Sequence, residues 1–395
     1  MAGYAVLALA YIMSQFFRAF LAVLTPVLSS ELAMTKPELG LASGMFFITF
    51  AFMQFKVGLM LDQKGPRDTA GLWFPIFAGG GAFLFALSTN SWMIIAAMSL
   101  IGIGCSPVLM ASYFLFAKTG DPARFAIFTT WLVAFGTLGN VAGTSPLALA
   151  VENFGWRPTI TSLGILAIII GLGILAVVKR DQPIAATKGS GYSGYVALLR
   201  MPFLWPMIPL MILAYMPPAG IRGLWAGPYL TETFGADAIS IGNVTFFMAL
   251  SMAFGSFLYG PAEKFFGSAK WVIFAANCGQ VCVLLWLAFA APQSIAFAGL
   301  LFAAIGLFGM TYGLQMAHGR AFLPPDLLGR GVTLMNFFNI IGVGVMQIAG
   351  GTILAYFHRS DPQHAFANLF LIYAIMVALS LVSFLFAKDA PRIHA

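Results

Sequence analysis

Long apolar runs separated by short polar stretches constrain this chain more than any other feature. About 20 consecutive apolar residues are enough for a helix to cross the hydrocarbon core of a bilayer. An α-helix also satisfies its own backbone hydrogen bonds there, so we predict an all-α integral membrane protein with twelve transmembrane helices. The predicted spans are residues 4–28, 39–60, 69–88, 92–117, 125–150, 158–178, 202–226, 239–260, 271–290, 295–317, 331–355 and 367–387.

The scarcity of charge excludes a soluble protein. Only 8% of the 395 residues are charged and 60% are hydrophobic, whereas a soluble domain carries about 25% charge. The net charge of +7 does not indicate nucleic-acid binding, because the basic residues are spread over short loops. We therefore expect the lipid bilayer and a small molecule as partners, and no nucleic acid.

The basic residues fall mainly on one side of the predicted spans. Of the 20 Lys and Arg residues, fourteen lie in the even-numbered loops and the C-terminal tail. Only Lys36, Arg157 and Arg359 lie on the opposite side, and three more lie within spans. Because loops rich in Lys and Arg stay in the cytoplasm, both termini are predicted to be cytoplasmic. We expect a multi-pass protein of the plasma or inner membrane.

The longest polar interval, residues 179–201, is predicted to be a cytoplasmic linker. It separates an N-terminal half, 1–178, from a C-terminal half, 202–395, with six spans each. The halves share a weak likeness in and after their first spans: Arg18, Pro26 and Glu31 in one, and Arg222, Pro228 and Glu232 in the other. Spans 5 and 11 both carry glycines that indicate close helix packing: Gly136, Gly139, Gly143, Gly342, Gly344, Gly350 and Gly351.

Three charged residues, Arg18, Lys56 and Arg222, lie within predicted spans, and all are basic. All 13 acidic residues fall in loops or at span ends. A mid-membrane arginine costs about 2.5–3.5 kcal/mol on the mildest scale and usually faces a cavity. Without an internal acid, its natural partner is a substrate that carries its own negative charge. The alternative for each arginine is a bond to backbone carbonyls or snorkelling to an interface. Snorkelling is the favoured account of Lys56, near the cytoplasmic end of span 2.

Polar side chains in the C-terminal half are candidates for further substrate contacts. Trp225 lies three residues after Arg222 and can stack on a guanidinium or a planar substrate. Hydrogen bonds in the cavity are expected from Tyr312, Gln315, Asn336 and Asn339. Helix-to-helix hydrogen bonding explains these polar residues equally well. The prolines in the stretch 217–220 should interrupt span 7 and free backbone groups to face a cavity.

The only charge-dense loop between two long apolar runs contains Gly58, Asp62, Gly65 and Arg67. Their spacing resembles the GxxxDxxGRR-type loop between helices 2 and 3 of the major facilitator superfamily. The resemblance implies two pseudo-symmetric six-helix halves that alternate access to a central cavity. It also implies that spans 1 and 7 line that cavity as symmetry mates. An arginine on each of them resembles the arrangement in organophosphate:phosphate antiporters, where two arginines clamp a phosphate.

Two departures from family patterns matter. The family often has a proline where this chain has Lys56, which we do not explain. The glycine-proline motif of drug:proton antiporters in span 5 is absent, because Asn140 follows Gly139.

Asp62 is expected to be held by basic partners at the cytoplasmic helix ends. Arg67 and Arg124 are the best candidates, and the start of span 11, at Arg330, lies close by.

The sequence favours a secondary transporter for a small organic anion bearing a carboxylate or phosphate. Proton carriage usually needs a titratable group in the pathway, and His318 is the only candidate. We therefore expect anion exchange, as in an antiporter, or facilitated movement, by a functional monomer. The alternatives are proton-coupled efflux of amphipathic compounds or drugs, and a membrane sensor that does not transport. An enzyme, a cofactor or a metal site is not expected, since no nucleophile elbow or metal-ligand spacing is present.

Overall fold

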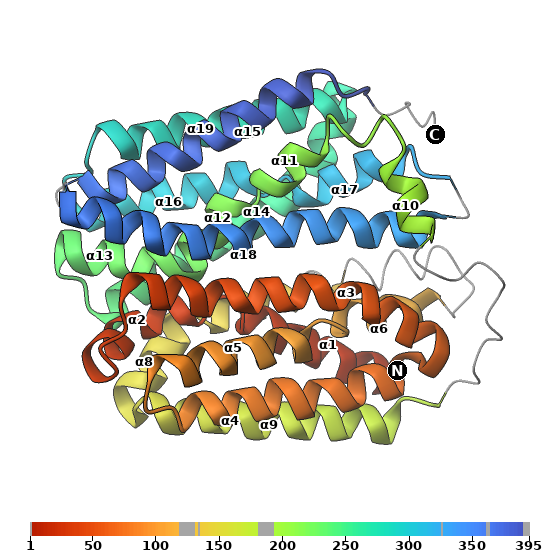
Figure 1. Cartoon of the computed structure of the whole chain (residues 1–395), viewed down its shortest axis with the longest axis horizontal. Coiled ribbons are helices and arrows are strands. Elements are labelled where there is room, and N and C mark those ends of the chain that lie inside the picture. Colours follow the sequence, from red (N-terminus) through yellow and green to blue (C-terminus); the bar gives the residue numbers. More distant parts are fainter. Residues whose placement is uncertain are drawn as a thin grey trace. The chain divides into compact units, whose positions relative to one another are not determined.

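Helices make up the regular secondary structure of the part of the chain that the computed structural model describes (Figure 1). That part comprises residues 2–117, 131–132, 135–180, 193–324, 327–360 and 364–389. Within it, nine helices are long and apolar enough to cross a membrane, or ten when the bent pair α1–α2 is counted as one span. The all-α prediction is confirmed. Most of the N-terminal part of predicted span 5 lies outside the described residues, and predicted span 7 is divided into short helices.

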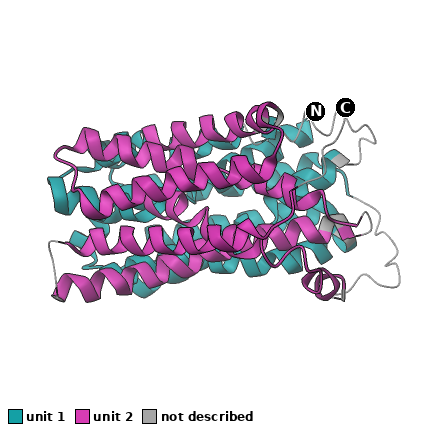
Figure 2. Cartoon of the chain, turned by 90° about the horizontal axis from the view of Figure 1, so that it is seen from above, with its two compact units in different colours: residues 1–188, 223–246 teal, residues 189–222, 247–395 magenta. Residues whose placement is uncertain are grey.

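The chain forms two compact units (Figure 2). Unit 1 contains residues 1–188 and 223–246, and unit 2 contains residues 189–222 and 247–395. The stretch 223–246 thus belongs to unit 1 although it lies late in the sequence. The predicted halves 1–178 and 202–395, with a linker at 179–201, stay a prediction.

Several elements of unit 1 lie wholly within the described residues, among them α13 from later in the sequence. They are α1 (Ala2–Phe16), α2 (Leu21–Glu31), α3 (Lys36–Trp73), η1 (Phe74–Gly79), α4 (Gly80–Ala86), α5 (Ser91–Cys105), α6 (Val108–Ala117), α8 (Ser145–Phe154), α9 (Trp156–Val177) and α13 (Ala226–Phe234). α3 contains predicted span 2 and the start of predicted span 3, which continues through η1 and α4, and the chain turns between these spans at Gly65. Gly65 has φ 75° and ψ 176°, a backbone conformation that glycine adopts without the strain of a Cβ atom.

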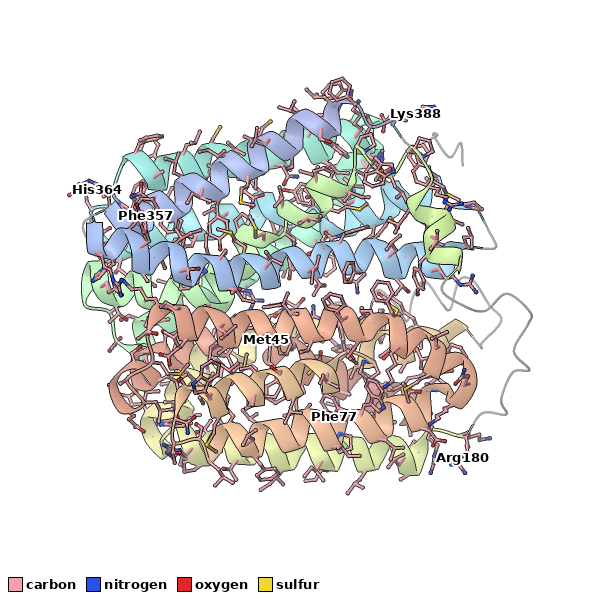
Figure 3. All side chains as sticks on the ribbon, in the orientation of Figure 1. Met45, Phe77, Arg180, Phe357, His364 and Lys388 are labelled. Carbon is pink, nitrogen blue, oxygen red and sulfur yellow. The ribbon has the colours of Figure 1, made fainter. Side chains whose placement is uncertain are left out.

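Contacts at the two ends of α9 show which loops of unit 1 lie on which side of its helices. At its start, the Trp156 indole donates to the Glu31 carboxylate at 2.9 Å, which brings the end of α2 to this side. Beyond its other end, the Arg180 guanidinium donates to Asp68 at 3.0 Å, next to the turn at Gly65 (Figure 3). Loops therefore alternate between two faces, as the predicted multi-span topology requires.

Unit 2 contains the rest of the C-terminal helices. They are α10 (Ser193–Leu199), α11 (Ile208–Leu213), α12 (Met216–Gly220), α15 (Ala269–Phe289), α16 (Ile295–Gly309), α17 (Tyr312–Arg320), α18 (Leu328–Ser360) and α19 (Ala365–Leu385). Two elements cross the unit boundary, η2 (Ile221–Trp225) and α14 (Ala238–Phe266). His364 and Lys388 flank the two ends of α19 (Figure 3).

Glycines on predicted spans 5 and 11 make the close helix contacts that their pattern indicates. A Cβ atom added to Gly139 would overlap the carbonyl oxygen of Ile12 on α1. A Cβ atom added to Gly342 on α18 would overlap the carbonyl oxygen of Ile212 on α11. The same contact thus recurs between spans 5 and 1 in unit 1 and between spans 11 and 7 in unit 2.

Alanine at either contact should destabilise the protein. In Gly139→Ala and Gly342→Ala, the added methyl group must displace a backbone, and overpacking of this kind costs about 1–3 kcal/mol. Gly313→Ala is the matched control, because no described atom lies within 4 Å of a Cβ built there. Thermal unfolding in detergent, followed by tryptophan fluorescence, should show a lower melting temperature for the first two variants only. Equal melting temperatures in all three would contradict the close-contact account.

Candidate functional site

Arg18 lies where predicted span 1 is broken. α1 ends at Phe16 and α2 begins at Leu21, and the two helices are bent by 49°. The intervening turn has no proline or glycine, and Phe17 and Phe20 within it are almost fully buried. Packing of large rings, more than local backbone preference, therefore sets this bend.

The Arg18 guanidinium is held against an aromatic ring. Its Cζ atom lies 4.5 Å from the centroid of Phe50 on α3. Its Nε atom is buried, and no described residue accepts a hydrogen bond from it. A buried charged donor without an acceptor is costly, so this position favours an anion that supplies one.

Arg222 lies in a second irregular stretch, in predicted span 7. The helix is interrupted at Ala214 and Tyr215, restarts as α12 with two prolines in its first turn, and continues as the π-helix η2. Proline is tolerated in a first turn because the N–H groups there have no helical partner. Arg222 within η2 is 2% exposed. π-helical turns are rare and occur frequently at functional sites.

Two buried glutamines bond the carbonyls of this broken span. Gln280 Nε2 donates to the Ala214 carbonyl at 3.2 Å, an acceptor that Pro218 cannot serve because it has no N–H. Gln347 Nε2 donates to the Gly220 carbonyl at 3.2 Å. Both glutamines are fully buried, and the sequence interpretation missed them. The sequence does contain a signal for both residues, since a glutamine inside an apolar run usually has a hydrogen-bonding role.

The two arginines belong to different units, Arg18 to unit 1 and Arg222 to unit 2. The boundary falls directly after Arg222, so Trp225 belongs to unit 1. Trp225 is fully buried, and no described residue accepts a hydrogen bond from its indole Nε1. A joint site of these three residues stays a prediction.

The four polar candidates on predicted spans 10 and 11 all lie in unit 2. The Tyr312 hydroxyl donates to Asn336 Oδ1 at 2.8 Å, so the structure brings these two side chains together. Gln315 Nε2 donates to the hydroxyl of Thr311, and Asn339 Nδ2 donates to the Met335 carbonyl at 3.0 Å. The Tyr312–Asn336 bond joins α17 to α18, whereas the bonds of Gln315 and Asn339 run to residues four positions earlier in the chain.

Buried amide oxygens are a common feature of this interior. Asn339, Gln280 and Gln347 each donate an N–H to a backbone carbonyl, which can only accept. That bond fixes the orientation of each amide, and its oxygen finds no hydrogen-bond donor among the described residues. Unit 2 is therefore rich in free acceptors, which suits water or a ligand with hydroxyl groups.

The charged loop after Gly58 is only partly described. Arg67 Nε donates to the Leu175 carbonyl at 2.8 Å, and its Nη1 contacts Asp68 at 2.8 Å. Asp68 also bonds Arg180, so one carboxylate ties the turn at Gly65 to the end of α9. The sequence interpretation missed Asp68 and Arg180. The side chain of Asp62 and all of Arg124 lie outside the described residues.

The remaining basic candidates have different surroundings. Arg330 on α18 packs over α10, since a Cβ atom built on Gly194 would overlap its Nη1. Lys56 is exposed, with its ammonium 5.8 Å from the ring centroid of Trp73. His318 is 1% exposed at the end of α17, and its Nδ1 lies 4.0 Å from Asp389. Among the described residues no cluster of His, Cys, Asp and Glu fits a metal ion.

The chain matches known proteins along nearly its whole length. The model of the Major Facilitator Superfamily matches residues 7–224 and 210–395. "Membrane sensor protein UhpC" of Salmonella typhimurium is 25% identical over a match of 423 positions, gaps included, which covers 97% of this chain and 91% of that protein. "Probable L-galactonate transporter" of Escherichia coli is 20% identical, covering 95% and 86%. "Probable hexose phosphate transport protein" of Chlamydia trachomatis is 27% identical over 184 residues, 44% of this chain and 38% of that protein.

Solved structures share the fold. The crystal structure of a bacterial homolog of the human lysosomal transporter Spinster, in an inward-facing and unoccupied conformation, has a TM-score of 0.80 and 15% identity. That likeness covers 98% of this chain and 96% of the other. The nucleoside transporter NupG has a TM-score of 0.74, with 15% identity and 98% of both chains covered. At this identity the likeness shows the fold alone.

Loss of either arginine should abolish anion binding at the predicted two-arginine site without unfolding the protein. Arg18→Ala and Arg222→Ala each remove a charge-assisted contact worth about 2–5 kcal/mol, so the Kd should rise at least about thirtyfold. The exposed Arg359→Ala is the control for net charge. Thermal-shift titration with mono- and dicarboxylates, phosphates and sulfonates measures the affinities. Near-normal affinity of both variants for every anion that the native protein binds would refute the two-arginine site.

A second prediction separates Asp62 from its neighbour Asp68. Asp62→Asn should slow exchange far more than it weakens binding, because a bracing contact biases the access states and does not touch the ligand. Asp68→Asn should mainly lower the melting temperature, because Asp68 joins Arg67 and Arg180 within unit 1. Rates of counterflow and equilibrium affinities are compared for both variants. Equal loss of binding and exchange in Asp62→Asn would argue against a role in gating.

Proposed function

Because the chain belongs to the Major Facilitator Superfamily, as its loop at Asp62 predicts, we propose that it carries a small organic anion across the membrane by alternating access. The superfamily fold is confirmed by the likeness to solved structures. The described helices are consistent with twelve spans. The chain is thus a multi-pass membrane protein of a transporter family.

One observation carries the anion assignment: an arginine lies in the irregular stretch of span 1 and another in that of span 7. Arg18 falls between α1 and α2, and Arg222 falls within η2. All acidic side chains that the structure describes lie at helix ends or in loops, and the Arg18 guanidinium lies beside the ring of Phe50. A guanidinium binds carboxylate or phosphate oxygens with two parallel hydrogen bonds. An anionic ligand would supply the acceptor that the buried Nε of Arg18 lacks among the described residues.

The names of the relatives support the same class of substrate. L-Galactonate and hexose phosphate, named for two of them, are both organic anions. Both also carry several hydroxyl groups. The free amide oxygens of Asn339, Gln280 and Gln347 in unit 2 would accept hydrogen bonds from such groups. These observations favour a carboxylate or phosphate ester over an amphipathic drug.

The energy of anion entry favours exchange. A membrane potential of 100 mV, negative inside, opposes each entering negative charge by about 2.3 kcal/mol. An importer must therefore export another anion or carry protons with its substrate. His318 is the one titratable candidate, and its burial beside Phe322 and Phe384 suits a packing role. We therefore propose that the protein exchanges anions or lets them move downhill, without enzymatic chemistry.

The orientation and organisation follow from the sequence. The excess of basic residues in the even-numbered loops supports cytoplasmic termini and an inner-membrane location. We extend the proposal to two six-span halves, 1–178 and 202–395, that act as a functional monomer. Asp62, Arg67, Arg124 and Arg330 would brace the cytoplasmic ends of their helices.

A sensor is the second candidate, and a specific observation favours it. The relative that matches 97% of this chain at 25% identity is named a membrane sensor protein. A sensor would bind the anion at the same arginines without carrying it. Counterflow in vesicles separates the two functions, because a sensor binds and does not exchange.

Proteoliposomes preloaded with unlabelled anion should take up labelled anion without a pH gradient. His318→Gln should leave the rate unchanged within about twofold, because exchange needs no proton carrier. Arg18→Ala is the inactive control. Strict dependence on an imposed proton gradient, lost in His318→Gln, would overturn exchange. Binding without any counterflow would establish the sensor instead.

A further inference from the structure

A cavity of about 380 Å³ lies between α2, the start of α3 and α13. All of its lining residues belong to unit 1, and its volume falls in the range of about 300–1,000 Å³ typical of small-molecule pockets. Gly227 lets α13 approach α2 closely, because a Cβ atom there would overlap the Thr25 hydroxyl. Pro26 and Pro228, which occupy like positions in spans 1 and 7, both line the cavity. The positive-inside rule assigns this end of the helices to the outer face.

An ion pair forms part of the cavity wall. Lys36 Nζ lies 2.8 Å from Glu232 Oε2 and so joins the start of α3 to α13. The side chain of Lys36 is 16% exposed and that of Glu232 is 39% exposed. Water screens a pair of this kind, so it contributes little to stability. Glu232 can therefore turn away and leave Lys36 to another anion.

The hydroxyl groups of the cavity complement a hydroxylated ligand. Ser30 donates its proton to the Val27 carbonyl at 3.1 Å, and Thr231 donates to the Ala236 carbonyl at 3.3 Å. Since both protons are used on the backbone, the two hydroxyl oxygens are left to accept hydrogen bonds. The cavity thus presents one cationic donor for a negative group and neutral acceptors for hydroxyl donors.

We propose that this cavity is a second, outer binding site for a hydroxylated organic anion, whose charged group takes the place of Glu232 on Lys36. The inference rests on the proposed function, since the ligand is the anion on its way to or from Arg18 and Arg222. Glu232 competes with that ligand and covers Lys36 when the cavity is empty. Binding breaks the ion pair that joins α3 to α13.

Protection of a single cysteine tests the site directly. Ser30 is exposed and lines the cavity, so Ser30→Cys places a reporter at its mouth. Cys278 and Cys282, the two cysteines that are not fully buried, are replaced by serine. The rate of modification by a water-soluble maleimide is measured with gluconate, glucose 6-phosphate or hexanoate. Hexanoate has the same six-carbon length as gluconate and no hydroxyl groups.

Gluconate or glucose 6-phosphate should slow the modification, and hexanoate should act only at much higher concentration. Lys36→Gln should raise the half-protecting concentration at least about tenfold, because it removes a hydrogen bond to a charged group. Lys36→Arg should retain protection, and Glu232→Gln should lower the half-protecting concentration by removing the competitor. Arg359→Gln, which removes an exposed positive charge outside the cavity, should have no effect.

The labelling experiment is repeated with Arg18→Ala added to each protein, which separates the outer site from the central one. Protection that persists in Arg18→Ala and disappears in Lys36→Gln supports an independent outer site. Protection that is lost in Arg18→Ala, unchanged in Lys36→Gln, or absent with both hydroxylated anions would overturn it. Equilibrium dialysis of both anions is carried out in Lys36→Gln, which lacks the outer site, with and without Arg18→Ala, and so measures the central site in parallel. Binding that does not depend on Arg18 contradicts the proposed function and leaves the labelling result to decide the outer site.

Discussion

Every backbone N–H and C=O group in the hydrocarbon needs a partner within the protein, and the candidate site is built where side chains meet this need. Gln280 and Gln347 bond carbonyls of the broken span 7 in unit 2. In unit 1, Gln54 donates to the carbonyl of Ser106 at 3.2 Å, directly before Pro107. These glutamines make the interruptions of spans 4 and 7 part of a fixed structure. The backbone around Arg222 is accordingly held in place by neighbouring helices.

The distribution of charge distinguishes Arg18 from the basic residues near helix ends. Two ion pairs, Arg157 with Glu31 and Arg180 with Asp68, lie near helix ends. Arg18, at mid-span, has an aromatic ring beside it instead of a carboxylate. A ring face attracts a cation but accepts no strong hydrogen bond. The arginine thus retains hydrogen-bonding capacity for an anion, while a cationic ligand would be repelled.

The sequence predicted what depends on local pattern and missed what depends on packing. Apolar length predicted the spans, and the two prolines at 217 and 218 predicted the interruption of span 7. The bend at Arg18 has no such signal, because it follows from the burial of Phe17 and Phe20 against other helices. The pairing of Asp68 with Arg180 joins residues 112 apart in sequence, which no local pattern reveals.

Arg222 lies at the boundary between the two units, so a ligand bound there would act on the stretch of span 7 that passes from one unit to the other. Before it, α12 is tied to unit 2 through Gly220 and Gln347. After it, α13 is tied to unit 1 through the close contact of Gly227 with Thr25 and the ion pair of Glu232. Span 7 thus passes from one unit to the other within η2, a turn whose hydrogen bonds already differ from those of an α-helix. A ligand shifts a conformational equilibrium only by binding its states unequally. A ligand held at this turn would contact the stretch of span 7 in which the chain passes from unit 2 to unit 1.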